Sequence, residues 1–246
     1  MLTTRSYRYF HYRDSNLRIA CERFDLVTAE HVHQYGLLEA YIRRHPAFRT
    51  TLEPLELLPE APHVARVMAQ ATRAVGVGPM AAVAGTLAQL DAAAAAAAGC
   101  AEAIVENGGD IYIITDREVT VGIYAGDNPI AARLAFHITP ADAPLAICSS
   151  SGTMGHSLSL GQCDLATVVA ESGALADAVA TLVGNRIHTE ADIEPALNAA
   201  ALIPGIRGVL AVKGEKLGIW GKLPRLVRNT DATTGAKITR DHRNRG

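Results

Sequence analysis

Two polar residues interrupt an otherwise apolar helical segment. Asp177 and Thr181 are the only polar side chains between Ala174 and Val183, and their spacing of four places both on one face of a helix. A carboxylate buried among Ala, Leu and Val is costly unless it is paired or coordinates a cation, and these oxygens suit Mg²⁺. In the structural alternative, Asp177 favours the positive end of its own helix and Thr181 bonds to a carbonyl one turn earlier.

A glycine pair forms the second candidate site. Asn107-Gly108-Gly109-Asp110 lies between two expected strands, at 102–106 and 111–115. Asn-Gly is a strong hairpin signal, so a tight turn is one interpretation. In the other, the adjacent glycines leave backbone N–H groups accessible to a cofactor, and Asn107 and Asp110 supply polar contacts. A glycine pair alone does not decide between them.

A loop rich in hydroxyl groups follows the strand expected at 145–149. It reads SSSGTMGHSLSLG over residues 149–161. Such a loop can bind phosphate in a nest of backbone amides, and it can equally be a solvated loop without chemistry. The candidate cofactor-binding residues are Ser151, Gly152 and Thr153. Ser150, with His156 as its base, is the candidate catalytic pair, although no G-x-S-x-G elbow is present.

The composition indicates a soluble globular protein and gives no case for a nucleic-acid partner. Hydrophobic residues make up 49% of the 246 residues, charged residues 20%, and the net charge of -2 gives no basic face for nucleic acid. We see no apolar run of the 18–20 residues that a membrane span needs, and no secretory signal. The scattered cysteines indicate reduced thiols in a cytoplasmic protein. They are Cys21, Cys100, Cys148 and Cys163. The sequence does not decide whether the protein forms a homodimer.

The elements expected around these residues are helices interleaved with hairpins. We expect hairpins at 6–13/17–25 and 206–213/216–220, further strands at 118–125, 131–138 and 165–170, and helices at 62–74, 79–98 and 174–185. Thr28 is the expected N-cap of another helix that ends before Pro46. This order predicts an α+β domain over residues 1–228, with a mainly antiparallel sheet packed against helices. Residues 229–246 are polar and unpatterned, which predicts a flexible tail that adds little stability.

In order and spacing, these motifs resemble the ApbE superfamily over about residues 75–185. The matching segments are VGPMAAVAG, ENGGD, the serine loop and ADAVAT. The resemblance implies a T-fold-like layered fold, binding of FAD with Mg²⁺, and transfer of the FMN half to a threonine of an acceptor protein. It also implies that Asp177 and Thr181 hold the metal and that Asn107–Asp110 borders the flavin.

Within the matched region, the chain departs from that superfamily at two places. Ala84-Gly85 stands where a lysine-glycine pair is usual, and the short segment Gly155–Asp164 replaces an H-I-x-D-P-x-T-G motif. We therefore expect a Mg²⁺-dependent enzyme that handles a flavin or a related nucleotide. The alternative is a non-catalytic ligand-binding or assembly protein on the same scaffold. We also expect the glycine turn, the serine loop and the Asp177 face to converge on one pocket.

Overall fold

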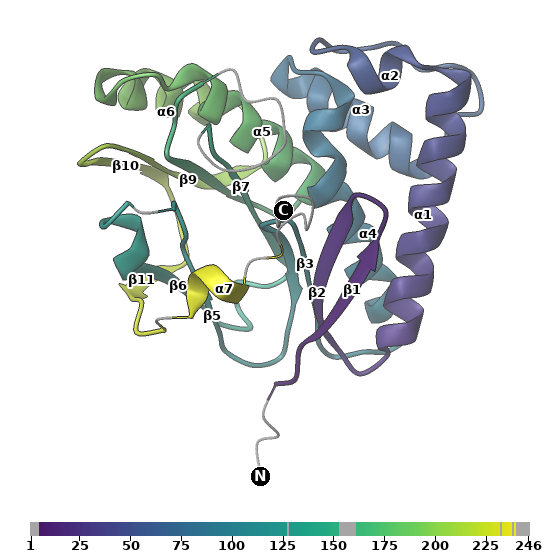
Figure 1. Ribbon diagram of the computed structural model, residues 1–246, viewed down its shortest axis with the longest axis horizontal. Coiled ribbons are helices and arrows are strands. Elements are labelled where there is room, and N and C mark those ends of the chain that lie inside the picture. Colours follow the sequence, from purple (N-terminus) through teal and green to yellow (C-terminus); the bar gives the residue numbers. More distant parts are fainter. Residues whose placement is uncertain (1–4, 127, 153–160, 232, 238, 240–246) are drawn as a thin grey trace, which may run out of the picture.

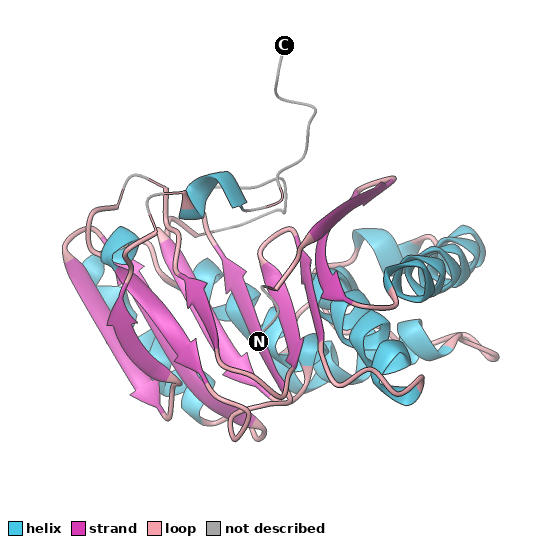
Figure 2. Cartoon of the chain, turned by 90° about the horizontal axis from the view of Figure 1, so that it is seen from below, coloured by secondary structure: helices cyan, strands magenta, loops and turns pink. Residues whose placement is uncertain are grey.

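The protein has three layers: helices, a large sheet and a small sheet (Figures 1 and 2). The computed structural model describes residues 5–126, 128–152, 161–231, 233–237 and 239. The large sheet has eight strands in the order β1-β2-β3-β4-β7-β8-β9-β10, and every neighbouring pair is antiparallel. The small sheet has the order β11-β6-β5. This arrangement is the α+β layered class predicted from the element order.

The strands and helices have the following bounds. The large sheet consists of β1 (Arg8–Tyr12), β2 (Ser15–Cys21), β3 (Ala103–Asn107), β4 (Asp110–Ile114), β7 (Leu145–Ser150), β8 (Leu165–Ala170), β9 (Ile206–Lys213) and β10 (Lys216–Gly221). The small sheet consists of β5 (Val119–Gly122), β6 (Leu134–Ile138) and β11 (Arg225–Arg228). The helices are α1 (Phe24–Arg44), α2 (Ala47–Thr50), α3 (His63–Val75), α4 (Val83–Ala97), α5 (Gly173–Arg186), α6 (Ile193–Ala201) and α7 (Thr234–Lys237), with 3-10 turns η1 (Pro79–Ala82), η2 (Ala131–Arg133) and η3 (Glu190–Asp192).

The two faces of the large sheet carry different cores, because successive residues of a strand point to opposite sides. Val105 of β3 belongs to the core under the helices, whereas Ile104 belongs to the core under the small sheet. Glu106 therefore shares the small-sheet face with Ile104. On β4, Asp110 shares the helix-covered face with Tyr112, which belongs to the helix-side core. This alternation divides the polar residues of the site between two sides.

Helices α4 and α5 cross at a point where only glycine fits. A Cβ atom on Gly85 would lie 2.4 Å from the carbonyl oxygen of Gly173, and one on Gly173 would lie 2.3 Å from the carbonyl oxygen of Gly85. The alanine run of α4 adds small side chains to the same interface. Ala92 and Ala95 of this run are fully buried in the core under the helices, so these two positions have a packing role.

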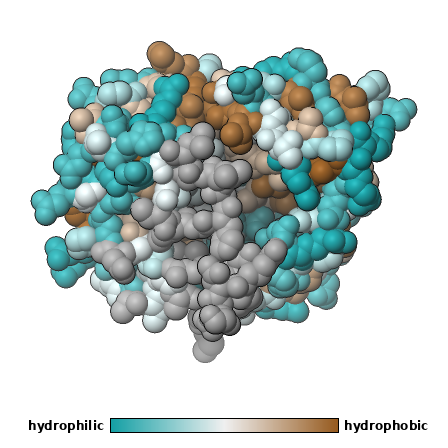
Figure 3. Space-filling view, turned by 45° about the horizontal axis from the view of Figure 1, so that its top comes forward, coloured by the Kyte–Doolittle hydropathy of each residue, from teal (hydrophilic) through white to brown (hydrophobic). Residues whose placement is uncertain are grey.

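The apolar helix formed by η1 and α4 bears on the expectation about membranes. Pro79–Ala97 is 19 residues long and has a mean hydropathy of 1.3, so by length and composition it could cross a membrane. The expectation that the chain has no apolar run of membrane-spanning length was therefore wrong. This helix packs against β3, β4, α1 and α5 inside the fold, as the core helix of a globular domain does. Hydrophilic side chains cover much of the face in Figure 3, with apolar ones in smaller groups.

Helix α1 begins earlier than its capping signal indicates. Thr28 lies inside the helix, which starts at Phe24, and its hydroxyl donates to the carbonyl oxygen of Asp25 at 3.2 Å. The predicted N-cap at Thr28 was therefore wrong. Phe24 and Val27 are buried in the core under the helices, so tertiary packing stabilises an additional turn of helix before Thr28.

Part of the C-terminal segment contacts the body of the protein. The Asn229 N–H donates to the carbonyl oxygen of Arg133 at 2.8 Å, and the Thr239 hydroxyl donates to Glu106 Oε1 at 2.7 Å. A Cβ atom on Gly122 would lie 2.6 Å from the Thr234 methyl group, so α7 packs closely on β5. The segment thus closes over one side of the small sheet. That it contributes little to stability stays a prediction.

Candidate functional site

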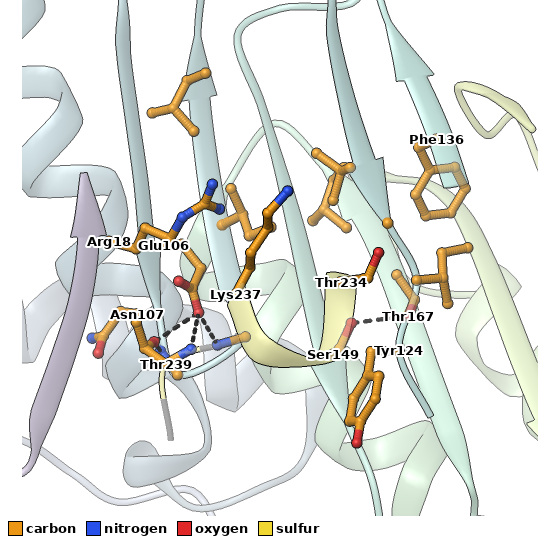
Figure 4. Close-up of a pocket in the computed structure, with 18 of the residues that line it drawn as sticks. Arg18, Glu106, Asn107, Tyr124, Phe136, Ser149, Thr167, Thr234, Lys237 and Thr239 are labelled. Atoms are coloured by element: carbon orange, nitrogen blue, oxygen red, sulfur yellow. Dashed lines mark hydrogen bonds between the residues drawn. The ribbon is translucent and has the colours of Figure 1, made fainter. Parts of the chain in front are cut away.

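A cavity of about 1010 Å³ lies between the large sheet and the small sheet. Its walls are apolar, with Ile104, Ile147, Leu165 and Phe136 among them. Polar side chains gather toward the end where β3 meets β4 and the C-terminal segment (Figure 4). They include Arg18, Glu106, Asn107, Ser149, Thr167, Lys237 and Thr239. A cavity with an apolar part and with polar groups gathered at one end is typical of a small-molecule site.

The glycine pair is both a tight turn and part of the cavity wall. Asn107 pairs with Asp110, and Gly108 and Gly109 have φ of 65° and 108°, which is the type I′ hairpin geometry that favours glycine. The Gly109 N–H donates to Glu106 Oε1 at 3.0 Å, and the Gly108 N–H donates to the Thr239 hydroxyl at 3.0 Å. Both amides therefore have protein partners, which differs from the expectation that they are bare.

The serines of β7 point to alternate sides of the sheet. The Ser149 hydroxyl lies 3.0 Å from the Thr167 hydroxyl inside the cavity. A Cβ atom on Gly184 of α5 would lie 3.0 Å from Ser150 Oγ, which places that hydroxyl on the helix side. Ser151 is buried and lines the cavity. Thr153 and His156 lie outside the described residues, so the proposed Ser150–His156 pair stays a prediction.

Gly152 has a conformational reason to be glycine. Its N–H donates to the carbonyl oxygen of Cys163 at 2.8 Å, and a Cβ atom on it would lie 2.3 Å from the carbonyl oxygen of Gly161. The beginning and the end of the serine loop are therefore held in close contact. This brings Ser151 to the cavity wall beside the glycine turn.

Two carboxylates interact on the helix-covered side of the sheet. Asp177 Oδ2 accepts a hydrogen bond from the Gly85 N–H at 2.9 Å, and Asp110 Oδ1 accepts one from the Ser149 N–H at 3.1 Å. Burial raises the pKa of Asp110 to about 7. Burial, and then the charge of Asp110, raise the pKa of Asp177 well above its usual range. Burial is the main cause of both shifts, and the charge of Asp110 adds to the shift of Asp177. Two buried carboxylates without a cationic partner form an arrangement that a bound cation stabilises.

The Gly85 contact gives Asp177 a structural role that its own helix did not suggest. Gly85 lies in the first turn of α4, where backbone N–H groups have no partner within the helix. Asp177 therefore caps a second helix from outside. The α5 helix has its own cap, because the Ser172 hydroxyl accepts from the Leu175 N–H at 3.3 Å. Thr181 follows Asp177 by one turn of α5 and is half-buried.

Of the three predicted clusters, two share the large cavity. The glycine turn and Ser149–Ser151 line it, whereas Asp177 lies across the sheet and is linked to it through Asp110 and Ser149. A second cavity of about 340 Å³ lies on the helix side and is lined by Val83 and Ala84, the residues that precede Gly85. Asp14 and Asn107 line both cavities, so both cavities extend to this end of the sheet.

The sequence analysis missed several polar residues of the fold. Arg18 stands between Leu17 and Ile19, and Glu106 follows Ile104 and Val105, a signal that could have marked both residues. His31 and Asp91 form a fully buried pair, with His31 Nδ1 2.7 Å from Asp91 Oδ2. These two residues lie on different helices, and no spacing in the sequence joins them.

The fold is that of the ApbE flavin transferases. The structure resembles apo ApbE flavinyl transferase from Pseudomonas stutzeri with a TM-score of 0.57, at 11% identity, over 97% of this chain and 98% of that one. It resembles the flavin transferase ApbE from Vibrio cholerae with a TM-score of 0.54, at 12% identity, over 88% of this chain and 96% of that one. At such identities the likeness shows the architecture alone.

The sequence relationships are narrower. The chain belongs to the family described as AbpE bacteria, whose model matches residues 2–203. It is 45% identical over 211 residues to a UPF0280 protein of Methanocella arvoryzae, covering 85% of this chain and 86% of the relative. It is 44% identical over 198 residues to a UPF0280 protein of Methanosarcina acetivorans, covering 80% of this chain and 78% of the relative. The predicted resemblance to the ApbE superfamily is confirmed.

Proposed function

We propose that this protein binds a flavin nucleotide, or a related nucleotide, together with Mg²⁺. The observation that carries the proposal is the buried acid pair Asp110–Asp177, which is linked through Ser149 to a cavity large enough for a nucleotide on the other side of the sheet. The flavin transferases that share the fold support the flavin as the first ligand to test. The large cavity would receive the ring system, and the acid pair would lie near the phosphates.

The donor atoms fit a hard divalent cation. Asp110, Asp177 and Thr181 offer carboxylate and hydroxyl oxygens, which Mg²⁺ prefers, and it keeps waters and phosphate oxygens in its remaining positions. Burial is the main reason that the pKa values of both carboxylates are raised, and a bound cation would stabilise their charged forms. When bound, the metal would neutralise charge on the phosphates and on the leaving group.

The two cavities suit a ligand with two ends. A dinucleotide such as FAD would place one end in each cavity, and Asp14 and Asn107, which line both, would lie beside its middle. Such a ligand passes the glycine turn. The turn residues Asn107–Asp110, with Ser151, Gly152 and Thr153, are the proposed cofactor contacts.

We propose transfer of the FMN half of FAD to a hydroxyl of an acceptor protein as the reaction. The diphosphate bond breaks, AMP leaves, a phosphoester forms on the acceptor oxygen, and a base takes the hydroxyl proton. His156 is the candidate base, and Ser150 is the candidate residue beside it. The cysteines among the described residues are free thiols, which fits the proposed cytoplasmic location.

The experiment measures binding and turnover separately. Purified protein is titrated with FAD, with Mg²⁺ and then with EDTA, and the release of AMP is followed by chromatography. Mg²⁺-dependent FAD binding with AMP release supports the enzyme. Mg²⁺-dependent binding without AMP release, in the presence of candidate acceptor peptides, supports the non-catalytic alternative. FAD affinity that is the same in Mg²⁺ and in EDTA contradicts the metal site.

A matched pair of variants controls the titration. Asp177→Asn removes a charge from the acid pair. Asp116→Asn makes the same chemical change at an exposed position, outside both cavities. Only the first variant should lose the Mg²⁺ dependence of FAD binding.

A further inference from the structure

Arg18 and Glu106 are direct neighbours across two paired strands. Arg18 of β2 pairs with Glu106 of β3 in the antiparallel register, and both line the large cavity. Such neighbours have Cβ atoms about 4.5–5.5 Å apart, close enough for an ion pair. Arg18 and Glu106 nevertheless form no ion pair within 4.0 Å, although both are described residues.

Each side chain is held by a different partner. The Arg18 guanidinium carbon lies 3.7 Å from the centre of the Tyr7 ring, a cation–π contact that fixes the plane of the group. Glu106 Oε1 accepts from the Gly109 N–H and from both the N–H and the hydroxyl of Thr239. These contacts turn the two groups away from each other and fix both orientations.

One donor and one acceptor of this pair are buried without a partner. Arg18 Nε and Glu106 Oε2 are both shielded from solvent, and neither has a hydrogen-bond partner. Glu106 is only 5% exposed. Leaving a buried polar group unpaired costs roughly 1–3 kcal/mol, and such groups in native proteins call for an explanation. Figure 4 shows the two side chains next to each other at the polar end of the cavity.

We propose that Arg18 and Glu106 together recognise a lactam edge, an N–H beside a C=O, on a planar heterocycle in the large cavity. Arg18 donates to the ring carbonyl and Glu106 Oε2 accepts from the ring N–H. The apolar walls formed by Ile104, Ile147 and Phe136 accept the faces of the ring. This inference rests on the proposed function, because it assigns the atoms that would hold the ring of the nucleotide.

The Glu106 carboxylate favours a neutral ring with a lactam edge over a simple anion such as phosphate. A phosphate placed against Arg18 would also approach Glu106, and like charges at such a distance repel. A ring that offers a donor and an acceptor side by side satisfies both protein groups without adding charge. A site built to hydrogen-bond a ligand N–H also rejects the analogue that lacks it. The pair is therefore a specificity determinant for the ring.

The test compares two ligands that differ only in the substituent on one ring nitrogen, a hydrogen or a methyl group. Riboflavin carries an N–H between two carbonyls, and N3-methylriboflavin lacks that donor. We expect Glu106→Gln, which turns the free acceptor into a donor, to weaken riboflavin binding at least about tenfold by fluorescence titration. N3-methylation should weaken binding by a similar factor in the unaltered protein and have little further effect in Glu106→Gln.

Controls keep a folding defect apart from a recognition defect. Glu171→Gln makes the same change at an exposed position beside Arg207, and it should bind riboflavin as the unaltered protein does. Arg18→Lys keeps the charge but loses the Nε donor, and it should lower riboflavin affinity while leaving the melting temperature nearly unchanged. If Glu106→Gln does not fold, the N3-methyl comparison and Arg18→Lys still test the proposal.

Several results would overturn the assignment. One is equal affinity of the unaltered protein for riboflavin and N3-methylriboflavin. Another is no binding of either riboflavin or lumazine, a pteridine dione with the same edge. Mg²⁺-dependent FAD binding that Glu106→Gln leaves unchanged would refute the recognition pair while the proposed function stands. Riboflavin binding that shows the expected losses, with FAD affinity indifferent to Mg²⁺, would uphold the pair and refute the metal site.

Discussion

Replacing Asp177 separates its capping role from a role in metal binding. Asp177→Asn keeps an oxygen that can accept the Gly85 N–H, which the carboxylate accepts at 2.9 Å. Burial and the neighbouring Asp110 raise the pKa of Asp177 well above its usual range, so the surroundings already favour the uncharged carboxyl group. Asp177→Asn replaces that group with a neutral amide of similar size. We therefore expect the free energy of unfolding without metal to change by less than about 1 kcal/mol.

Asp177→Ala provides the contrasting case. It removes the acceptor and leaves a first-turn N–H of α4 without its partner, which costs roughly 0.5–2 kcal/mol for a helix cap. Both variants should weaken Mg²⁺-dependent FAD binding at least about tenfold, or about 1.4 kcal/mol. Denaturant unfolding in EDTA gives the stability, and calorimetric titration with Mg²⁺ gives the affinity. An Asn variant that is destabilised as strongly as the Ala variant, or one that keeps full affinity, would refute the reasoning.

Three further predictions concern packing, charge and the C-terminal segment. Gly85→Ala should destabilise the protein by about 1–3 kcal/mol in chemical denaturation, because the new Cβ would lie 2.4 Å from the Gly173 carbonyl; Gly36→Ala, with open space around it, is the control. Burial raises the pKa of Asp110 to about 7 in the folded state, against a usual value of about 4. Stability without metal should therefore fall as pH rises from about 4 to about 7 and level off above that, and a melting temperature that rises over this pH range would contradict the prediction. Ending the chain after Arg228 should leave the melting temperature nearly unchanged, because water can replace the hydrogen bonds that this half-buried segment makes to the body of the protein; a fall of more than a few degrees would show that the segment stabilises the fold.

The local elements could be predicted from the sequence because their signals are local. The strand expected at 165–170 is β8 with the same bounds, and the helix expected at 174–185 differs from α5 by one residue at each end. The structure also has a capping box between Thr189 and Asp192 at η3, two residues that lie three positions apart in the sequence. Each depends on residues within a few positions of one another, through periodicity or capping. Motif order also identified the superfamily, although β11 and α7 were not expected.

Only the tertiary structure decided how these elements combine into a site. β5 follows β4 after a short connection, yet it belongs to the other sheet, so the cavity exists only because the chain changes layers there. Asp177 finds its partner Gly85 from 92 residues away, and Glu106 meets Thr239 from 133 residues away. The sequence by itself determined which residues are polar within apolar elements. Long-range packing decided which of them share a face, because burial and charge act between neighbours in space, whatever their separation along the chain.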